Sequence, residues 1–271
     1  GMNKVELIAK HKVDSDLDLK NLYQLNGQAF QEKNIGKIIL NYGGKSIKLR
    51  DLFYIKYKKS KKRHISIKGS NLFYHNIGYE WQEDLLEVYG DVGSFLGSKM
   101  KSGILKINGS CQNFLGCNMV GGEILVKKNV KDYVGAADYG EKFGMTGGKI
   151  EIHGTAGSYL GYRMRGGLIK VKGGVSDFCA NNLIAGTIII ESTIGKNFGV
   201  GMKRRTLILL ESPGNFKGQF KSCGLQQLDF VQLINESLLD STFFKQNQFL
   251  KFIGDRNNQG LGEILIKNKG C

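Results

Sequence analysis

The most regular feature of the chain is a pair of apolar residues, separated by one residue, that returns about every nineteen positions. The pairs are Leu86/Val88, Leu105/Ile107, Ile124/Val126, Ile150/Ile152, Ile169/Val171, Ile188/Ile190 and Leu207/Leu209. Because side chains of a β-strand point alternately to opposite faces, this spacing indicates a strand with one buried face. The pattern therefore predicts one short strand in each repeat.

Other residue types recur with the same period. Glycines stand at 103, 122, 148, 167 and 186, so the intervals are 19, 26, 19 and 19, and the long interval holds seven extra residues near 136–142. A methionine column follows the same rule, with members Met100, Met119, Met145, Met164, Leu183 and Met202. An aromatic column comprises Phe95, Phe114, Tyr133, Tyr159 and Phe178. Independent columns that share one period and one insertion indicate a structural repeat.

A unit of nineteen residues is too short to bury its own apolar face, whereas stacked units bury it against one another. Glycine columns then mark corners, and the single proline of the chain agrees with a fold in which proline would remove ladder hydrogen bonds. We therefore predict an all-β fold, a single-stranded parallel β-helix with coils of about 19 residues. Right-handed winding is expected, because parallel crossovers are right-handed in ~98% of cases.

Charged residues offer a test of this register, because equivalent positions of neighbouring coils lie side by side. Four outward pairs are opposite in sign: Glu87/Lys106, Glu123/Lys149, Glu151/Lys170 and Lys172/Glu191. Their signs support parallel, in-register coils.

The repeat divides the chain into three parts. Residues 1–84 are expected to form irregular first coils, with apolar segments at 38–40, 47–49 and 52–55, and residues 85–211 form the regular β-helix. Residues 212–271 change character. The apolar spacing of 225–239 predicts a helix that caps the open end, and 263–266 predicts a returning strand.

Composition limits the possible functions. The chain has 38 glycines but is 41% hydrophobic, which argues against disorder, and it has no run of eighteen apolar residues, so we predict no membrane contact. The net charge is +15, and lysine supplies 32 of the 39 basic residues. This excess fits either an acidic partner or a soluble protein with a lysine-covered surface, and the scarcity of arginine argues against nucleic acid. Five cysteines without a C-x-x-C motif fit a reduced, cytoplasmic setting.

No arrangement of catalytic or metal-binding residues is recognisable, so we predict no catalytic residue, no cofactor and no metal. Glycosidase chemistry needs paired carboxylates, whereas the outward positions here alternate between Glu and Lys. The glycine motifs precede strands and not helices, which argues against a nucleotide site.

Two groups of residues are candidates for an interface. Leu125, Ile189 and Ile208 lie on the outward phase of their strands, where they form either a partner surface or a strip covered by the C-terminal segment of the same chain. The basic residues near the corner after the methionine column are the second group: Arg163, Arg165, Lys203, Arg204 and Arg205. They are expected either to bind an acidic tail or a partner protein, or to form a solvated edge.

Several stretches resemble a known family. They are GMTGGKI at 144–150, GYRMRGG at 161–167, AGTI at 185–188 and GMKRRTL at 201–207. These resemble the GXGXG domain, which is shared by the C-terminal part of glutamate synthase and the β-helical scaffold subunit of formylmethanofuran dehydrogenase. The upstream LRDLF at 49–53 and the insertion after Gly135 are similar to that dehydrogenase subunit.

The resemblance implies a non-catalytic scaffold subunit of a formylmethanofuran dehydrogenase-like, formyltransferase/hydrolase complex. Such complexes act in one-carbon metabolism, in methanogens and in methylotrophic bacteria. The implied partners are the other subunits of a C1-transfer complex and the acidic polyglutamyl tail of a carrier cofactor. Two further hypotheses stay open: a glutamate synthase-like GXGXG module that works with an amidotransferase, and a basic binding module for an acidic polymer.

Overall fold

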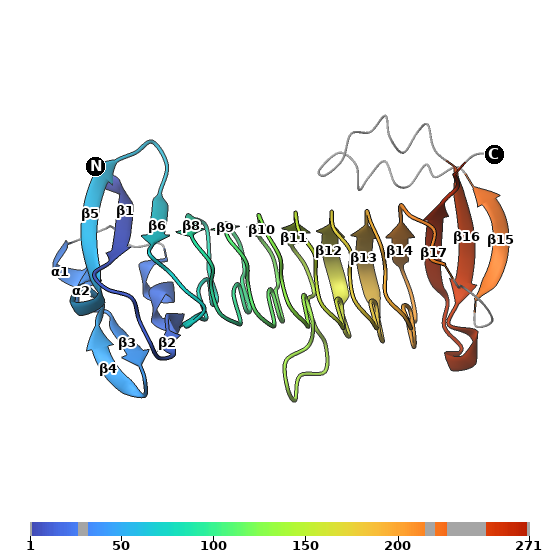
Figure 1. Cartoon of the computed structure of the whole chain (residues 1–271), viewed down its shortest axis with the longest axis horizontal. Helices are drawn as coiled ribbons and strands as arrows, with labels where there is room; N and C mark the ends of the chain where they lie inside the picture. Colours follow the sequence, from blue (N-terminus) through green and yellow to red (C-terminus); the bar gives the residue numbers. More distant parts are fainter. Residues whose placement is uncertain (1, 27–31, 215–219, 227–247, 270–271) are drawn as a thin grey trace.

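A computed structural model describes residues 2–26, 32–214, 220–226 and 248–269. These residues form an elongated, mostly β molecule in which a stack of similar coils lies between two end regions (Figure 1). Most strands belong to one long sheet, in the order β15-β16-β17-β14-β13-β12-β11-β10-β9-β8-β6-β1-β5. The prediction of an all-β fold is confirmed at this level.

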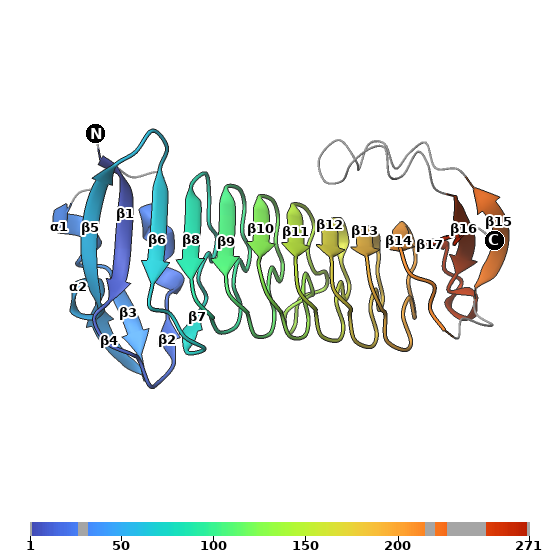
Figure 2. The ribbon, with the colours of Figure 1, turned by 45° about the horizontal axis from the view of Figure 1, so that its top comes forward.

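The middle of the long sheet consists of parallel strands, one from each coil, as Figures 1 and 2 show. Their bounds are β6 His64–Lys68, β8 Leu85–Tyr89, β9 Ile104–Asn108, β10 Glu123–Val126, β11 Lys149–Ile152, β12 Arg165–Val171, β13 Ala185–Ile190 and β14 Thr206–Leu209. Equivalent residues of the repeat are register partners; Leu105, for example, pairs with Ile124, which pairs with Ile150. The stack begins at β6, one coil before residue 85.

The corners before the strands explain the glycine and methionine columns. All six residues of the methionine column are fully buried. Gly148 has φ +88°, and a Cβ atom there would lie 2.7 Å from Met119 Cε and 2.9 Å from the backbone of Gly121. A glycine in one coil therefore leaves room for the methionine of the preceding coil, and the two columns depend on each other.

The insertion and the charged pairs fit the predicted register. Glu123 pairs with Lys149 in β10 and β11, so the extra residues bulge out as a longer loop that is visible in Figure 1. Glu151 is the register partner of Lys170, but its carboxylate lies 3.0 Å from His153 Nε2 and 3.9 Å from Lys172 Nζ. Lys170 instead lies 3.6 Å from Glu191. The predicted alignment is confirmed for Glu87/Lys106, Glu123/Lys149 and Glu151/Lys170. The ammonium groups of Lys170 and Lys172 nevertheless reach diagonally to carboxylates of neighbouring coils.

The N-terminal region is built differently from the coils. β1 (Met2–Ala9) pairs in parallel with β6 and antiparallel with β5 (Phe53–Lys59), the last strand of the long sheet. A small sheet has the order β4-β3-β2-β7. Its strands are β2 Leu17–Asp18, β3 Ile39–Tyr42, β4 Lys45–Lys48 and β7 Tyr74–His75, and the short helices are η1 Lys20–Leu25, α1 Glu32–Ile35 and α2 Leu49–Leu52.

The apolar segments at 38–40 and 47–49 were expected in irregular coils, but they lie in or beside the antiparallel hairpin β3–β4. The physical reason is its turn, because Gly43 and Gly44 both have positive φ, as a tight two-residue hairpin requires. Trp81, Tyr74 and Phe53 are the largest fully buried side chains of this end.

The C-terminal end closes the stack with antiparallel strands. β17 (Gly262–Lys267) pairs in parallel with β14 and contains the predicted returning strand. β16 (Phe249–Gly254) pairs antiparallel with β17 and with β15 (Lys221–Gln226), and the 3-10 turn η2 (Arg256–Asn258) precedes β17. Leu225 and Gln226 belong to β15, so the predicted helix 225–239 is wrong at its start; its residues 227–239 lie outside the described residues.

Candidate functional site

The aromatic column forms a continuous stack at one corner of the coils. Successive ring centroids are 4.7, 5.0, 5.0 and 4.9 Å apart, and the planes differ by at most 8°. The stacked rings are Phe95, Phe114, Tyr133, Tyr159 and Phe178. The aromatic column of the sequence is therefore a ladder of stacked rings in the structure.

The backbone of this column is left-handed. Its five aromatic residues have φ between 57° and 63°, and Asn76 and Asn197 occupy the same position at its two ends with φ 62° and 57°. Asparagine adopts this conformation readily, whereas other residues lose about 1–2 kcal/mol. Stacking must offset that cost in each of the five coils.

The insertion is anchored next to this column. The side chain of Asn118 donates from Nδ2 to the carbonyl of Phe143 (2.6 Å) and accepts at Oδ1 from the amide of Asp138 (3.1 Å). The amide of Ala137 donates to the carbonyl of Tyr162 (3.1 Å), and that of Gly144 to the carbonyl of Arg163 (2.8 Å). The loop is therefore hydrogen-bonded to the coils on both sides of it.

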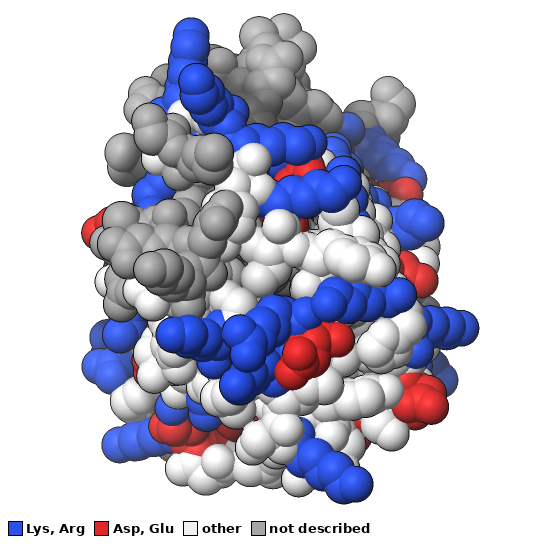
Figure 3. Space-filling model, turned by 90° about the vertical axis from the view of Figure 1, so that its left-hand side faces the viewer, with Lys and Arg blue, Asp and Glu red and all other residues white. Residues whose placement is uncertain are grey.

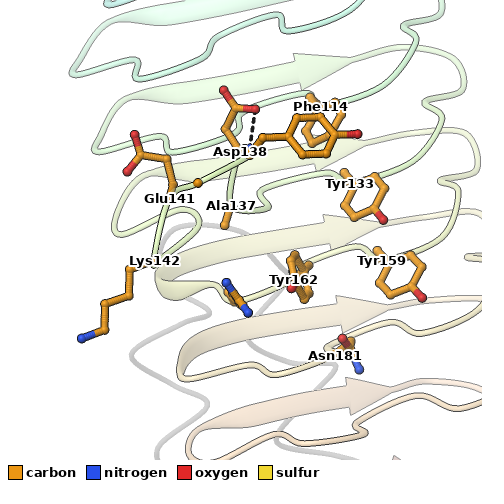
Figure 4. Close-up of a pocket in the computed structure, with 12 residues that line it drawn as sticks. Phe114, Tyr133, Ala137, Asp138, Glu141, Lys142, Tyr159, Tyr162 and Asn181 are labelled. Atoms are coloured by element: carbon orange, nitrogen blue, oxygen red, sulfur yellow. Dashed lines mark hydrogen bonds between the residues drawn. The ribbon is translucent and has the colours of Figure 1, made fainter.

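The loop and the aromatic stack enclose an open pocket of about 560 Å³ (Figure 4). The loop contributes residues 137–142. The lining residues from the coils are Phe114, Tyr133, Tyr159, Tyr162, Arg163 and Asn181. Figure 4 shows the Tyr133 and Tyr159 rings along one side, while Lys142 points outward from the loop.

Aromatic contacts determine where the cations around the pocket lie. Arg163 stacks over the Tyr162 ring, with its guanidinium carbon 5.1 Å from the centroid, and Arg165 lies 4.3 Å over Phe143. Lys142 Nζ is 5.3 Å from the centroid of the same Phe143 ring. The aromatic rings thus hold a basic rim around the pocket.

The two carboxylates of the loop are already engaged. Asp138 Oδ1 accepts from the amide of Tyr139 at 2.7 Å, and Glu141 lies 3.9 Å from Lys99. Burial, followed by the neighbouring Tyr159, raises the pKa of the Tyr133 phenol, so this hydroxyl is neutral at physiological pH. The pocket is equipped to bind a ligand by aromatic, cationic and hydrogen-bonding contacts.

The predicted apolar interface needs correction. Ile189 and Ile208 are fully buried, in a cluster with Phe249 and Leu265 of the C-terminal strands. This packing against strands of the same chain agrees with the second of the two expectations, and Ile189 and Ile208 are not a free surface. Leu125 is half-buried on β10.

The predicted basic residues are all exposed, but they do not form one cluster around the pocket. Arg163 lines the pocket and Arg165 is close to it through Phe143. Lys203, Arg204 and Arg205 occupy the equivalent corner two coils further on and do not line it. Their predicted role in binding a partner stays a prediction.

Sequence reasoning missed the residues that complete the pocket, namely Asp138, Tyr139, Tyr162 and Asn181. The available signal was the insertion itself. It breaks the regular spacing of the glycine column, it carries a tyrosine, and it interrupts the repeat beside the aromatic column.

The N-terminal end is a second notable surface. Residues 37–68 contain eleven basic residues and one acidic residue, Asp51. Figure 3 shows that lysine and arginine side chains spread over this end. Some of this charge is used within the fold, because Glu6 lies 3.1 Å from Lys58 and 3.7 Å from Lys68.

Buried cysteines act as packing residues. Burial raises the pKa of Cys179 to about 12 and that of Cys117 to about 11, so these thiols are unreactive. Within the described ranges, no group of three or more His, Cys, Asp or Glu is placed to hold a metal ion. None of the described helices is long and apolar enough to cross a membrane.

The repeat, the stacked coils and the glycine corners define a class of protein. The profile of the GXGXG motif family matches residues 63–242, which begin one residue before β6, and the chain belongs to this family.

Among solved structures, the chain is similar to one chain of the formyltransferase/hydrolase complex FhcABCD from Methylorubrum extorquens, whose crystal structure was determined in complex with methylofuran. The two chains are 30% identical, with a TM-score of 0.88, and the match covers 97% of this chain and 99% of the other. No curated protein sequence matches the chain.

Proposed function

We propose that this chain is an assembly subunit of a formyltransferase/hydrolase complex that acts in one-carbon metabolism. The observation that carries the proposal is the structural match to a chain of such a complex, which extends over 97% of this protein. The match includes the N-terminal region, which lies outside the span of the GXGXG profile.

The extent of the match also separates this proposal from the glutamate synthase-like hypothesis. A GXGXG module of a larger amidotransferase system would be expected to align over its coils alone. Here both end regions are shared, because 99% of the other chain is covered as well.

The role that we assign to the chain is that of a non-catalytic scaffold in the cytoplasm. We further propose that its coils wind as a right-handed parallel β-helix. The in-register parallel strands support this, as do the isolated parallel bridges Cys111–Val130, Ala156–Val175 and Val175–Ile194 on another side of the coils. Ladders on more than one side would make the stack a rigid support for other subunits.

Affinity purification from the native host tests the proposal. The tagged chain, expressed from its own locus, is expected to recover formyltransferase-like and amidohydrolase-like subunits in constant ratio. The recovered assembly should hydrolyse or transfer formyl groups, whereas the chain purified alone should not. Recovery of the chain without such subunits would contradict the proposal.

The basic N-terminal surface favours a second role, binding of an acidic polyglutamyl tail. Eleven basic residues against one acidic residue in 37–68 provide the complementary charge. Binding of poly-L-glutamate should weaken steeply between about 50 and 200 mM salt, because counterions are released. Replacing Lys56, Lys59 and Lys62 by Gln should weaken it further, while unchanged binding would exclude this surface.

A further inference from the structure

The pocket beside the insertion has the composition of a protein-binding hot spot. Tyrosine and arginine are enriched at the centres of protein interfaces, because they supply large contact areas and hydrogen bonds with few rotatable bonds. Tyr139, at the tip of the loop, is 86% exposed although it carries a large ring. Its ring lies 5.7 Å from that of Phe114, so it stands over the aromatic stack with its outer face open.

The site is also preorganised. The stack is held by the coils, and the loop is fixed by the Asn118 side chain and by the backbone hydrogen bonds of Ala137 and Gly144. Tyr162 lies nearly perpendicular to Tyr133 and Tyr159, at 77° and 83°. A partner therefore meets a surface that needs little ordering, which lowers the cost of association.

The charges indicate what the partner carries. Arg163, Arg165 and Lys142 each lie over an aromatic ring, and within the described part of the chain none of them pairs with a carboxylate. The nearby acids are engaged elsewhere, Asp138 with the loop backbone and Glu141 with Lys99. An arginine stacked on a ring keeps its N–H groups free for a carboxylate, which it binds with two parallel hydrogen bonds.

The volume fits a short segment. A pocket of about 560 Å³ accommodates a few side chains, and it lies on the outer wall of the stack, where an extended chain has access. Asn181 lines the pocket, and its Nδ2 donates to the carbonyl of Val200 at 3.2 Å, which leaves its Oδ1 as an acceptor for a peptide N–H group.

We propose that this pocket is the docking site for an extended segment of a partner subunit, which inserts an apolar side chain beside Tyr139 and Tyr162 and places a carboxylate on Arg163. The proposal rests on the assignment of the chain to a multisubunit complex, and it names the surface through which one contact is made.

Crosslinking in the assembled complex tests the location. A photoreactive benzoylphenylalanine at position 139, in the tagged chain purified from its host, is expected to crosslink to a peptide of a partner subunit that contains Asp or Glu. The same residue at Leu261, which is 73% exposed, precedes β17 and does not line the pocket, is the matched control and should not yield that peptide. A product with a small molecule alone, or no crosslink in an intact complex, would overturn the proposal.

Charge reversal tests the contact. Arg163→Glu should weaken retention of the partner by at least about tenfold on dilution of the complex, because it sets two carboxylates against each other. Arg163→Lys should have a smaller effect. Lys127→Glu is the control, since Lys127 is exposed and does not line the pocket.

The outcomes distinguish this proposal from the proposed function. If the unmodified chain recovers the partner subunits and Arg163→Glu retains them equally well, the pocket is not the contact and the subunit role stands. If the unmodified chain recovers none, both fail. Because Arg163 has a left-handed backbone (φ 55°), the thermal midpoint of each variant is measured. Tyr139→Ser, at an exposed loop tip, is a second variant that should fold normally and still lose retention.

Discussion

The coil stack and the N-terminal end are continuous in one sheet, yet they are stabilised in different ways. Between β8 and β14 every strand has a parallel neighbour on each side, and the same columns of residues meet again in each coil. In residues 2–59 the neighbours are mainly antiparallel and no column repeats among the described residues. In the coil stack, the repeated sequence itself determines which strands pair. At the end of the stack, other features must prevent a further strand from pairing with the last one.

Features that oppose the addition of another strand are found on β5. It is the last strand of the sheet and exposes Tyr54, Lys56, Lys58 and Lys59. Lysines on an edge strand oppose pairing with another chain, because a partner strand would bury them. The same lysines therefore oppose the pairing of a further strand and give this surface its positive charge.

The largest expected difference between the two regions concerns side-chain deletion in the core. Ile150→Ala in β11 should reduce the free energy of unfolding by about 2–5 kcal/mol, because the fully buried side chain packs between equivalent residues of two coils. Ile47→Ala, half-buried in the hairpin β3–β4, should cost about 1 kcal/mol. Urea unfolding measures both, and equal losses would remove the distinction.

Substitution of two glycines with similar backbone conformations, one in each region, compares how tightly the two regions are packed. Gly148 and Gly44 have φ +88° and +82°, but an added Cβ meets Met119 and the Gly121 backbone at Gly148 and open space at Gly44. Gly44→Ala should cost about 1 kcal/mol from the left-handed backbone alone, and Gly148→Ala about 2–4 kcal/mol, since the methionine column must also shift. If thermal unfolding gave the two variants the same midpoint, the coupling of the columns would be wrong.

An effect of pH is expected at the N-terminal end. Burial, and then the charge of Lys4, lower the pKa of His64, although Glu87 opposes the shift at 3.3 Å. The unfolded chain therefore binds a proton more readily than the folded one, and stability contributed here is present above the unfolded pKa of 6.5 and is lost as the pH falls below it. His64→Gln should flatten the pH dependence of the urea midpoint in this range. If the urea midpoint of His64→Gln changed with pH as steeply as that of the unmodified chain, protonation of His64 would not contribute to the pH dependence of stability.

Glu6 adds to the same trend at lower pH. The hydrogen bond from Lys58 lowers the pKa of Glu6 against the opposing effect of burial. Its stabilising contribution is present above the unfolded pKa of 4.5 and disappears as the pH falls through the lower folded value. Glu6→Gln should therefore lose stability at neutral pH and less at acid pH, as measured by urea unfolding at both.

The smallest effect is expected on the surface of the stack. Lys172 is exposed and lies 3.9 Å from Glu151, so Lys172→Ala should change the free energy of unfolding by less than about 1 kcal/mol. A larger loss in urea unfolding would mean that outward ion pairs hold the coils together.

Sequence alone predicted the stack well for a physical reason. Strand pairing in coils depends on columns such as Leu105, Ile124 and Ile150, and these recur in a single chain without any alignment. The hairpin at Gly43 and Gly44 was not predicted, because its sequence pattern is short and occurs only once. The alternation of apolar residues predicts that Ile189 and Ile208 lie on the outward face of their strands. It does not predict which residues pack against that face.

The pocket was beyond the same reasoning, because it forms where the period is broken. Phe114, Tyr133 and Tyr159 stand in one column of the repeat, but the loop beside them is held by the Asn118 side chain of the preceding coil. Contacts between a single insertion and its neighbouring coils have no periodic signature.

Native mass spectrometry of the endogenous assembly tests the central claim most directly. If the chain is a subunit of a formyltransferase/hydrolase complex, its 30.1 kDa mass should appear within a larger particle of fixed composition that dissociates to release it together with formyltransferase-like and amidohydrolase-like subunits. A particle that contains only copies of this chain, at native expression and low salt, would contradict the account.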